Sequence, residues 1–484
     1  MKKRIGLCLA AVLTFLLFPC FCSCKQGRAS RSRYDITAEY DPAHQTVTGV
    51  VKITFENPTQ RALTGVALQV YPNAYRENAL YPAVYPTEES LAYYDGKHYG
   101  EIAVTSVSGA KSWQITGEDE NVLSVTLIGE LFPQETVVLD VGFTVTLPKL
   151  NHRFGVSQTA VCLNRFFPTL CGIQNDAFVQ VTPTSIGEPF VFDCADYKLT
   201  LTLPKEYTPA ASCEGLVSQT LESKTEYVFT GENIRNFGLV LYTDRKLLQT
   251  QVGDTTLVYA YMKDEHAENT LRLIKEVFTY CENKFGAYPY PAFTLFQSSQ
   301  SGNAYGYTAL CTVSERLAGE ELVRAVARQI AKQWFGEIVG VDSSCNAWQS
   351  EGLAEYVALS FFEEHTGYGV EKEKQVVKYL QEYRSYYDIY GNVLDRTDTK
   401  MTKPLTEFVN EYEYRCISVN KAIVMLDALQ KSIGERRLFA GLKRYCRSYA
   451  YTLTGVAELV GALEHHGADT QGFFDGFLQG KVIL

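Results

Sequence analysis

Hydrophobic and polar positions alternate with a period of two over much of the first half of the chain. Between residues 137 and 147 every odd-numbered position is apolar, and Asp, Gly and Thr fall among the even ones. The stretch from Tyr197 to Leu203 repeats this alternation and ends at Pro204. Such alternation is typical of strands that bury one face. Residues 34–250 are therefore predicted to form an antiparallel β-sandwich or saddle domain.

From residue 251 onward, the apolar positions recur every three or four residues, which is the spacing of a helix with one buried face. The runs that show it most clearly are Leu271–Phe285, Ala422–Leu429 and Val456–Leu463. The last run is followed by Gly467, a residue type that commonly ends helices. We therefore predict an α+β multidomain protein whose second domain, residues 251–484, is mostly α.

The N-terminus has the layout of a secretory signal. Basic residues at positions 2–4 precede an apolar run at 5–18, which is shorter than the stretch that spans a bilayer. The sequence FCSC at 21–24 resembles a bacterial lipobox, in which the final cysteine, Cys24, is lipidated and becomes the mature N-terminus. Residues 1–24 are predicted to be a signal peptide with a lipobox, and a signal peptide cleaved without lipidation is the alternative.

Residues 25–33 form a basic tether, and no acidic residue precedes Asp35. The whole chain has a formal net charge of −10, so the part after the tether is strongly acidic. Nucleic-acid binding requires clustered Lys and Arg, so we expect no nucleic-acid partner. A lipid chain beside basic residues suits stable membrane anchoring. We expect an exported protein, lipid-anchored at the extracytoplasmic face of a bacterial membrane.

Candidate chemistry lies in the segment 320–335, whose apolar positions predict a helix. Arg328 and Lys332 lie one turn apart on the same face of this helix. In a His-Glu-x-x-His motif, two histidines with this spacing bind zinc and the Glu between them acts on the metal-bound water. Here the five positions read Arg328-Gln329-Ile330-Ala331-Lys332.

The flanking residues resemble a known family. Lys332 is followed by Gln-Trp-Phe-Gly, and Glu351 lies within Trp-Gln-Ser-Glu-Gly-Leu-Ala-Glu-Tyr at 348–356. These stretches resemble the His-x-Trp-Phe-Gly and Trp-Leu-x-Glu-Gly-x-Ala-Glu-Tyr blocks of the aminopeptidase N family of gluzincins (peptidase family M1). The resemblance implies a β saddle domain followed by a thermolysin-like catalytic-type domain, and it places Glu351 at the position of the third zinc ligand.

The sequence departs from this family at the zinc-binding positions. A guanidinium has no lone pair to give, so Arg328 cannot bind zinc. Lys332 could bind only as a free amine, which requires a pKa several units below its usual value of about 10.4. Gln329 replaces the general base with an amide that takes no proton near neutrality.

Two further positions lack the family's functional groups. Ala304 falls in the segment matched to the family's Gly-x-Met-Glu-Asn strand, whose Glu holds a substrate amino group. Val419 matches the Tyr that supports the tetrahedral oxyanion, and a slipped register would bring Tyr414 there instead.

We therefore interpret the chain as a pseudo-peptidase that needs no cofactor and whose retained cleft binds a peptide or a protein partner at the membrane surface. Arg328 and Lys332 could hold a ligand carboxylate, or they could pair with Glu351 and Glu355 so that a salt bridge replaces the zinc. The alternative is that all four side chains point to solvent.

Two other functions remain as hypotheses. The chain could be an active zinc peptidase with a rearranged site, in which Cys311, Cys345 or the pair His465 and His466 supply substitute ligands. It could also be a structural component of a surface complex. Metal-dependent thermal stabilisation would favour the active peptidase, whereas stabilisation by peptides without metal would favour the pseudo-peptidase.

Overall fold

The computed structural model describes residues 32–394, 398–465 and 470–482. The predicted signal, Cys24 and most of the tether lie outside these ranges, and so do His466 and Gly467. In the ranges described, no helix is both long and apolar enough to cross a membrane.

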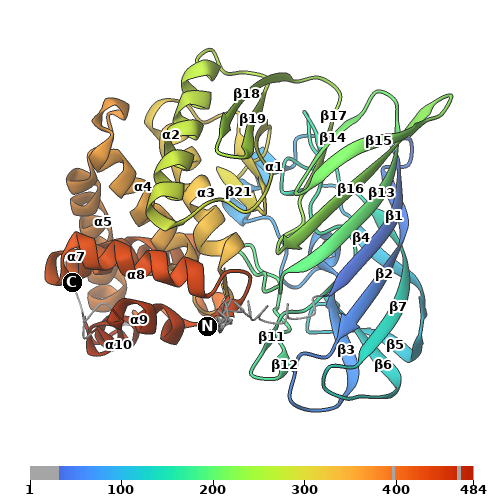
Figure 1. Ribbon diagram of the computed structural model, residues 1–484, viewed down its shortest axis with the longest axis horizontal. Helices are drawn as coiled ribbons and strands as arrows, with labels where there is room; N and C mark the ends of the chain where they lie inside the picture. The colour runs from blue at the N-terminus through green and yellow to red at the C-terminus, as the bar shows by residue number, and fades with distance from the viewer. Residues whose placement is uncertain (1–31, 395–397, 466–469, 483–484) are drawn as a thin grey trace, which may run out of the picture. The chain divides into compact units, whose positions relative to one another are not determined.

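A seven-stranded sheet organises the first half of the chain. Its strand order is β15-β16-β13-β1-β2-β7-β4, and β1 and β13 are parallel whereas the other neighbours are antiparallel. Figure 1 shows β16, β13, β1 and β2 side by side. The strands are β1 (Arg33–Asp41), β2 (Thr46–Glu56), β4 (Glu101–Ser108), β7 (Thr136–Thr146), β13 (Ala195–Pro204), β15 (Glu214–Thr220) and β16 (Lys224–Ile234). The two alternating stretches of the sequence fall in β7 and β13, so their prediction as strands is confirmed.

Two four-stranded sheets complete this β-rich half, with strand orders β10-β3-β6-β5 and β14-β17-β9-β8. Their strands are β3 (Leu63–Gln69), β5 (Ala110–Thr116), β6 (Val122–Leu131), β8 (Phe154–Val156), β9 (Val161–Leu163), β10 (Thr169–Leu170), β14 (Thr208–Ala211) and β17 (Leu239–Tyr242). Smaller elements are η1 (Tyr71–Tyr75), η2 (Pro86–Glu88), α1 (Glu89–Ala92), β11 (Ile173–Gln174) and β12 (Ala177–Phe178).

A five-stranded sheet, which the sequence analysis did not find, opens the second half. Its order is β18-β19-β20-β22-β21, with β19, β20 and β22 parallel. The strands are β18 (Lys246–Val252), β19 (Thr255–Tyr261), β20 (Ala292–Ser298), β21 (Ala304–Tyr307) and β22 (Leu310–Ser314). Every residue of β22 is buried, including the polar Thr312 and Ser314, so it has no solvent-exposed face and is too short for alternation to reveal it. Because β18 spans residue 250, this sheet extends to both sides of the domain boundary predicted there.

Helices make the second half mostly α, as predicted; the first lies between β19 and β20, and the others follow the sheet. They are α2 (Ala267–Phe285), α3 (Gly319–Lys332), η3 (Gln333–Ile338), η4 (Trp348–Gly352), α4 (Leu353–Glu364), η5 (Thr366–Tyr368), α5 (Lys372–Tyr387), η6 (Asp388–Val393), η7 (Leu405–Glu407), α6 (Glu411–Tyr414), η8 (Arg415–Asn420), α7 (Lys421–Ile433), α8 (Glu435–Ser448), α9 (Val456–Glu464) and α10 (Gln471–Leu478). The three helical runs of the sequence coincide with α2, α7 and α9. A short parallel pair, β23 (Gly340–Val341) and β24 (Leu453–Thr454), joins distant segments.

The helix predicted at 320–335 changes character partway along. It is α-helical up to Lys332 and continues as the π-helical segment η3, which contains the non-helical residue Phe335. π-Helical turns are rare and are frequent at functional sites. The transition falls directly after the last charged position of the candidate site.

Arg235 links several segments of the fold. Its guanidinium is buried and donates hydrogen bonds to the carbonyl oxygens of Phe192 (2.7 Å), Glu337 (3.1 Å) and Thr452 (3.1 Å). Charge-assisted hydrogen bonds of this kind are stronger than neutral ones. One side chain therefore ties the end of the β-rich half to η3 and to the loop before β24.

Replacing Arg235 with Met should lower the free energy of unfolding by about 3 kcal/mol or more, because several buried carbonyls would lose their donor. Arg436→Met, at an exposed position of α8, should change it by no more than about 0.5 kcal/mol. Urea denaturation followed by circular dichroism measures both. Equal stabilities for the two variants would contradict a linking role for Arg235.

Candidate functional site

The candidate site is built mainly from two packed helices and the strand that crosses them. Arg328, Gln329 and Lys332 lie on α3, and the opposing segment of η4 and α4 carries Glu351 and Glu355. Strand β21, which begins at Ala304, passes close to α3. A Cβ atom at position 306 would lie 2.8 Å from Oε1 of Gln329 and 3.7 Å from Cδ of Lys332. A side chain at position 306 would therefore displace the Gln329 amide, because β21 passes close to α3.

Lys332 forms the centre of this site. Its side chain is only 4% exposed, and its Nζ donates to Oε2 of Glu188 at 2.7 Å and to Oε1 of Glu351. Burial alone would lower the pKa of Lys332, but the two carboxylates more than offset it, so the pKa is raised. The amine is therefore held as an ammonium ion, paired with two carboxylates.

Glu188 is the main contact that sequence reasoning missed as a functional residue. It comes from the loop before β13, and in the sequence it was only part of a Gly-Glu-Pro-Phe stretch. Burial would raise the pKa of Glu188, but Lys332, Arg153 and Arg165 together lower it, so the carboxylate stays charged. Its distance along the chain from Lys332 left no spacing signal that could have revealed it.

Glu355 does not share Lys332. It accepts hydrogen bonds from Arg324 Nη2 at 2.7 Å and from the Tyr379 hydroxyl at 2.6 Å, which links α3, α4 and α5. Arg328 Nε lies 4.0 Å from Oε2 of Glu355, and it is buried without a hydrogen-bond partner among the described residues. Burial would raise the pKa of Glu355, but Arg324 and Arg328 lower it. Arg324 is thus the main partner of Glu355.

A phenol lies beside these charges. Burial, Glu351 and Glu188 all raise the pKa of Tyr414, the last residue of α6. A Cβ atom at position 187 would lie 3.0 Å from Cζ of Tyr414, so this ring also packs against the loop that carries Glu188. The structure thus brings Tyr414 to the site, as in the slipped register, whereas Val419 on η8 offers only an apolar side chain.

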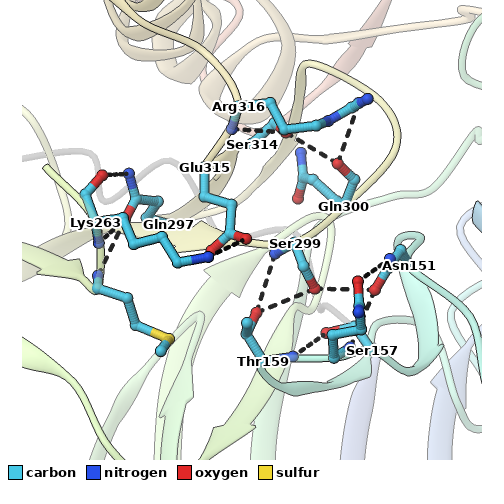
Figure 2. Close-up of polar contacts among 12 residues, drawn as sticks. Asn151, Ser157, Thr159, Lys263, Gln297, Ser299, Gln300, Ser314, Glu315 and Arg316 are labelled. Carbon is cyan, nitrogen blue, oxygen red and sulfur yellow. Dashed lines mark hydrogen bonds and ion pairs between the residues drawn. The ribbon is translucent and has the colours of Figure 1, made fainter. Parts of the chain in front are cut away.

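The chain that leads into β21 is fixed by a polar network (Figure 2). Ser299 donates to Oδ1 of Asn151 at 2.9 Å and accepts from the Thr159 hydroxyl at 3.1 Å. On the other side, the Ser314 hydroxyl donates to the carbonyl oxygen of Gln300 at 2.9 Å. Side chains of the β-rich half therefore hold the loop before β21 in place.

The space next to Lys332 is small. A cavity of about 20 Å³ is lined by Lys332, Glu188, Asn236 and Glu337 among others, which is room for one water molecule. Glu337 accepts hydrogen bonds from Asn236 Nδ2 (2.9 Å) and the Thr308 hydroxyl (2.8 Å), and burial raises its pKa. A peptide side chain does not fit beside the Lys332 ammonium.

The donor groups present do not fit a zinc ion. Arg328 offers no lone pair, and the Lys332 amine keeps its proton, so Glu351 is the only one of the three ligand positions with a usable oxygen. Within the ranges described, no group of three or more His, Cys, Asp or Glu side chains could hold a metal ion.

The substitute ligands do not gather either. Cys311 is buried in β22, where burial raises its pKa, and the half-buried Cys345 has its pKa raised to about 12 by burial and Asp342. A thiol with a raised pKa is a poor zinc ligand. His465 directly follows α9, and His466 lies outside the described residues.

Comparisons with known proteins show which family and which fold this chain resembles. A model of the Peptidase family M1 domain matches residues 305–477. Aminopeptidase M1-A of Oryza sativa subsp. japonica is 23% identical over 393 residues, which cover 72% of this chain and 41% of that protein. Tricorn protease-interacting factor F2 of Thermoplasma volcanium is 19% identical over 309 residues, 58% of this chain and 38% of that protein. The chain thus spans about two fifths of the length of these curated relatives.

A solved structure covers nearly the whole chain. It is a mutant M1 zinc metallopeptidase from Deinococcus radiodurans bound to a Tyr-Ser-Ala substrate, with a TM-score of 0.63 and 17% identity, covering 94% of this chain and 95% of that one. The fold is therefore that of two-domain M1 metallopeptidases. The match of residues 305–477 to the M1 domain model confirms the resemblance seen in the motifs.

Replacing Lys332 with Met should lower the free energy of unfolding at pH 7 by about 3–5 kcal/mol, because Glu188 and Glu351 would lose their counter-charge. Without Lys332, the pKa of Glu188 should rise in the folded state, because burial is then opposed only by Arg153 and Arg165. Proton uptake by Glu188 at lower pH would offset part of the loss. The loss should therefore shrink as the pH falls from 7 to about 5.

Urea denaturation at both pH values measures this effect. Lys332→Arg is the matched control, and it should lose less stability at pH 7 than Lys332→Met because it keeps a positive charge beside both carboxylates. Lys332→Met as stable as the wild type would mean that the carboxylates do not depend on Lys332.

Proposed function

We propose that this chain is a catalytically inactive M1-type protein that binds peptides without hydrolysing them. The observation that carries the proposal is the Lys332 ammonium, buried between Glu188 and Glu351 at one of the three zinc-ligand positions of the motif. Without a metal or a general base, nothing activates a water molecule or polarises a peptide carbonyl. Each of these roles is worth about a hundredfold or more in rate.

Peptide binding is supported by the fold that this chain shares with a peptide-bound relative. The Deinococcus metallopeptidase holds a Tyr-Ser-Ala substrate, and its fold covers almost all of the present chain. Binding surfaces on a fold can persist when the chemistry changes, because shape and chemistry depend on different residues. Since the cavity next to Lys332 holds about one water molecule, the ligand would lie at the outer edge of the charged site, where Arg328 is accessible.

We also propose that the protein is lipid-anchored through Cys24 at the extracytoplasmic face of a bacterial membrane. The proposal rests on the FCSC sequence after the apolar run and on the basic residues that follow it. The ligand would then be an extracytoplasmic peptide, or a peptide segment of a protein at that surface.

Rebuilding the motif tests the loss of catalysis. The full-length protein should contain no stoichiometric zinc after exchange into trace zinc, and it should release no amino acid from peptides. The variant Arg328→His, Gln329→Glu, Lys332→His should gain about one zinc per chain, because Glu351 is already in place. Elemental analysis measures the metal, and the same variant with Glu351→Gln is the control, which should bind zinc far more weakly. Stoichiometric zinc in the wild type would overturn the proposal.

Replacing Cys24 with Ser should move the protein from the detergent phase to the aqueous phase in a Triton X-114 partition of expressing cells. Cys22→Ser should leave the partition unchanged, because only the last cysteine of the lipobox receives lipid. Metabolic labelling with a radioactive fatty acid checks the lipid directly. Labelling that persists in Cys24→Ser would mean that another site carries the anchor.

A further inference from the structure

Cationic side chains outnumber carboxylates around Glu188. Among the described residues, Arg153, Arg165 and Lys332 all act electrostatically on this carboxylate. Lys332 is shared with Glu351, beside which Arg328 also lies. Four cationic side chains therefore face two carboxylates, Glu188 and Glu351. The excess positive charge lies within a chain whose net charge is −10.

Neighbouring carboxylates do not remove this excess. Glu355 accepts from Arg324, which offsets its charge. Glu337 is fully buried and its pKa is raised, so its charged form is disfavoured. Each of these carboxylates thus has its own local partner or is poorly charged.

The two inner arginines are unusually placed. Arg165 is 4% exposed with its guanidinium carbon 3.4 Å from the centre of the Phe190 ring, and Arg153 is 9% exposed and lies 4.3 Å from the centre of the Tyr305 ring. Nε of both arginines and Nη1 of Arg165 are buried without a hydrogen-bond partner among the described residues. Burying charged groups with unused donors is costly unless an anion or water compensates.

Arg328 is the most accessible of the four cations. Its side chain is 26% exposed, against 4% for the side chain of Lys332, and Arg153 and Arg165 are 9% and 4% exposed. Its nearest carboxylate, Glu355, is 4.0 Å away and is bonded to other donors. An incoming group would therefore meet the side chain of Arg328 before the other three cations.

We propose that this charge cluster binds a ligand carboxylate, and that Arg328 is the residue that contacts it, with Arg153 and Arg165 supplying positive potential from inside. The proposal rests on the proposed function, because it names the part of a bound peptide that the site recognises. A guanidinium presents parallel N–H donors that match the two oxygens of a carboxylate, so it suits this ligand better than an ammonium does. The carboxylate could be a peptide C-terminus or an acidic side chain.

The test uses the full-length chain and four random tripeptide pools. The first pool is free at both ends, the second is N-acetylated, the third is C-amidated, and the fourth is C-amidated with a central Glu. Affinity selection read by mass spectrometry gives the bound peptides, and calorimetry gives their affinities. We expect N-acetylation to leave binding unchanged and C-amidation to weaken it about tenfold or more.

Variants at Arg328 link this loss to the residue. Arg328→Gln should weaken binding of free peptides by the same factor as amidation, and it should weaken amidated peptides no further. Arg328→Lys should restore part of the affinity. Arg436→Gln on α8 is the matched control, with an exposed arginine removed outside the site, and it should bind like the wild type.

The outcomes distinguish recognition of a carboxylate from peptide binding in general. Binding of the fourth pool that is lost in Arg328→Gln would keep the carboxylate chemistry and assign it to a side chain. Binding that amidation leaves unchanged, or that only N-acetylation abolishes, would overturn carboxylate recognition while peptide binding stands. Retention of no pool by the folded wild-type protein would overturn both carboxylate recognition and the proposed function.

Discussion

The structure of the site depends on one buried ammonium shared by two carboxylates. Lys332 on α3, Glu188 from the loop before β13 and Glu351 in η4 come from separate segments, and none of them could be buried alone at low cost. The ammonium and the two carboxylates stabilise one another at the position where the family motif would hold a zinc ion. The same contact joins the β-rich half to the helical half, beside the buried guanidinium of Arg235.

The pairing of Lys332 with two carboxylates also leaves nearby cationic side chains without a full counter-charge. Because Lys332 uses both nearby carboxylates, Arg328 and the two buried arginines have no full counter-charge of their own. Glu355 is bonded by Arg324 and Tyr379 and does not supply it. The cluster is thus closed at its inner end, where the cavity admits about one water molecule, and positive at its accessible edge. This polarity is what suits it to an anionic group.

The sequence predicted much of this fold and part of the site. Alternation revealed β7 and β13 because each has one buried face, and helical spacing revealed α2, α7 and α9. The five-stranded sheet was missed because strands such as β22 are buried on both faces and carry no periodic signal. The motif spacing placed Lys332 and Glu351 on facing segments. It could not reveal Glu188, which reaches the site only through tertiary packing, and the π-helical turn at η8 obscured which residue supplies the phenol.

The shared ammonium also limits the paths by which this site could change. Substituting only Lys332 with a histidine would leave Glu188 and Glu351 facing a largely neutral ring, and substituting only Arg328 would leave Lys332 in the metal's place. A return to metal binding therefore requires several substitutions whose separate effects are unfavourable and whose combined effect is not. Because the two carboxylates depend on the lysine, each single substitution towards a metal site gives a less stable protein.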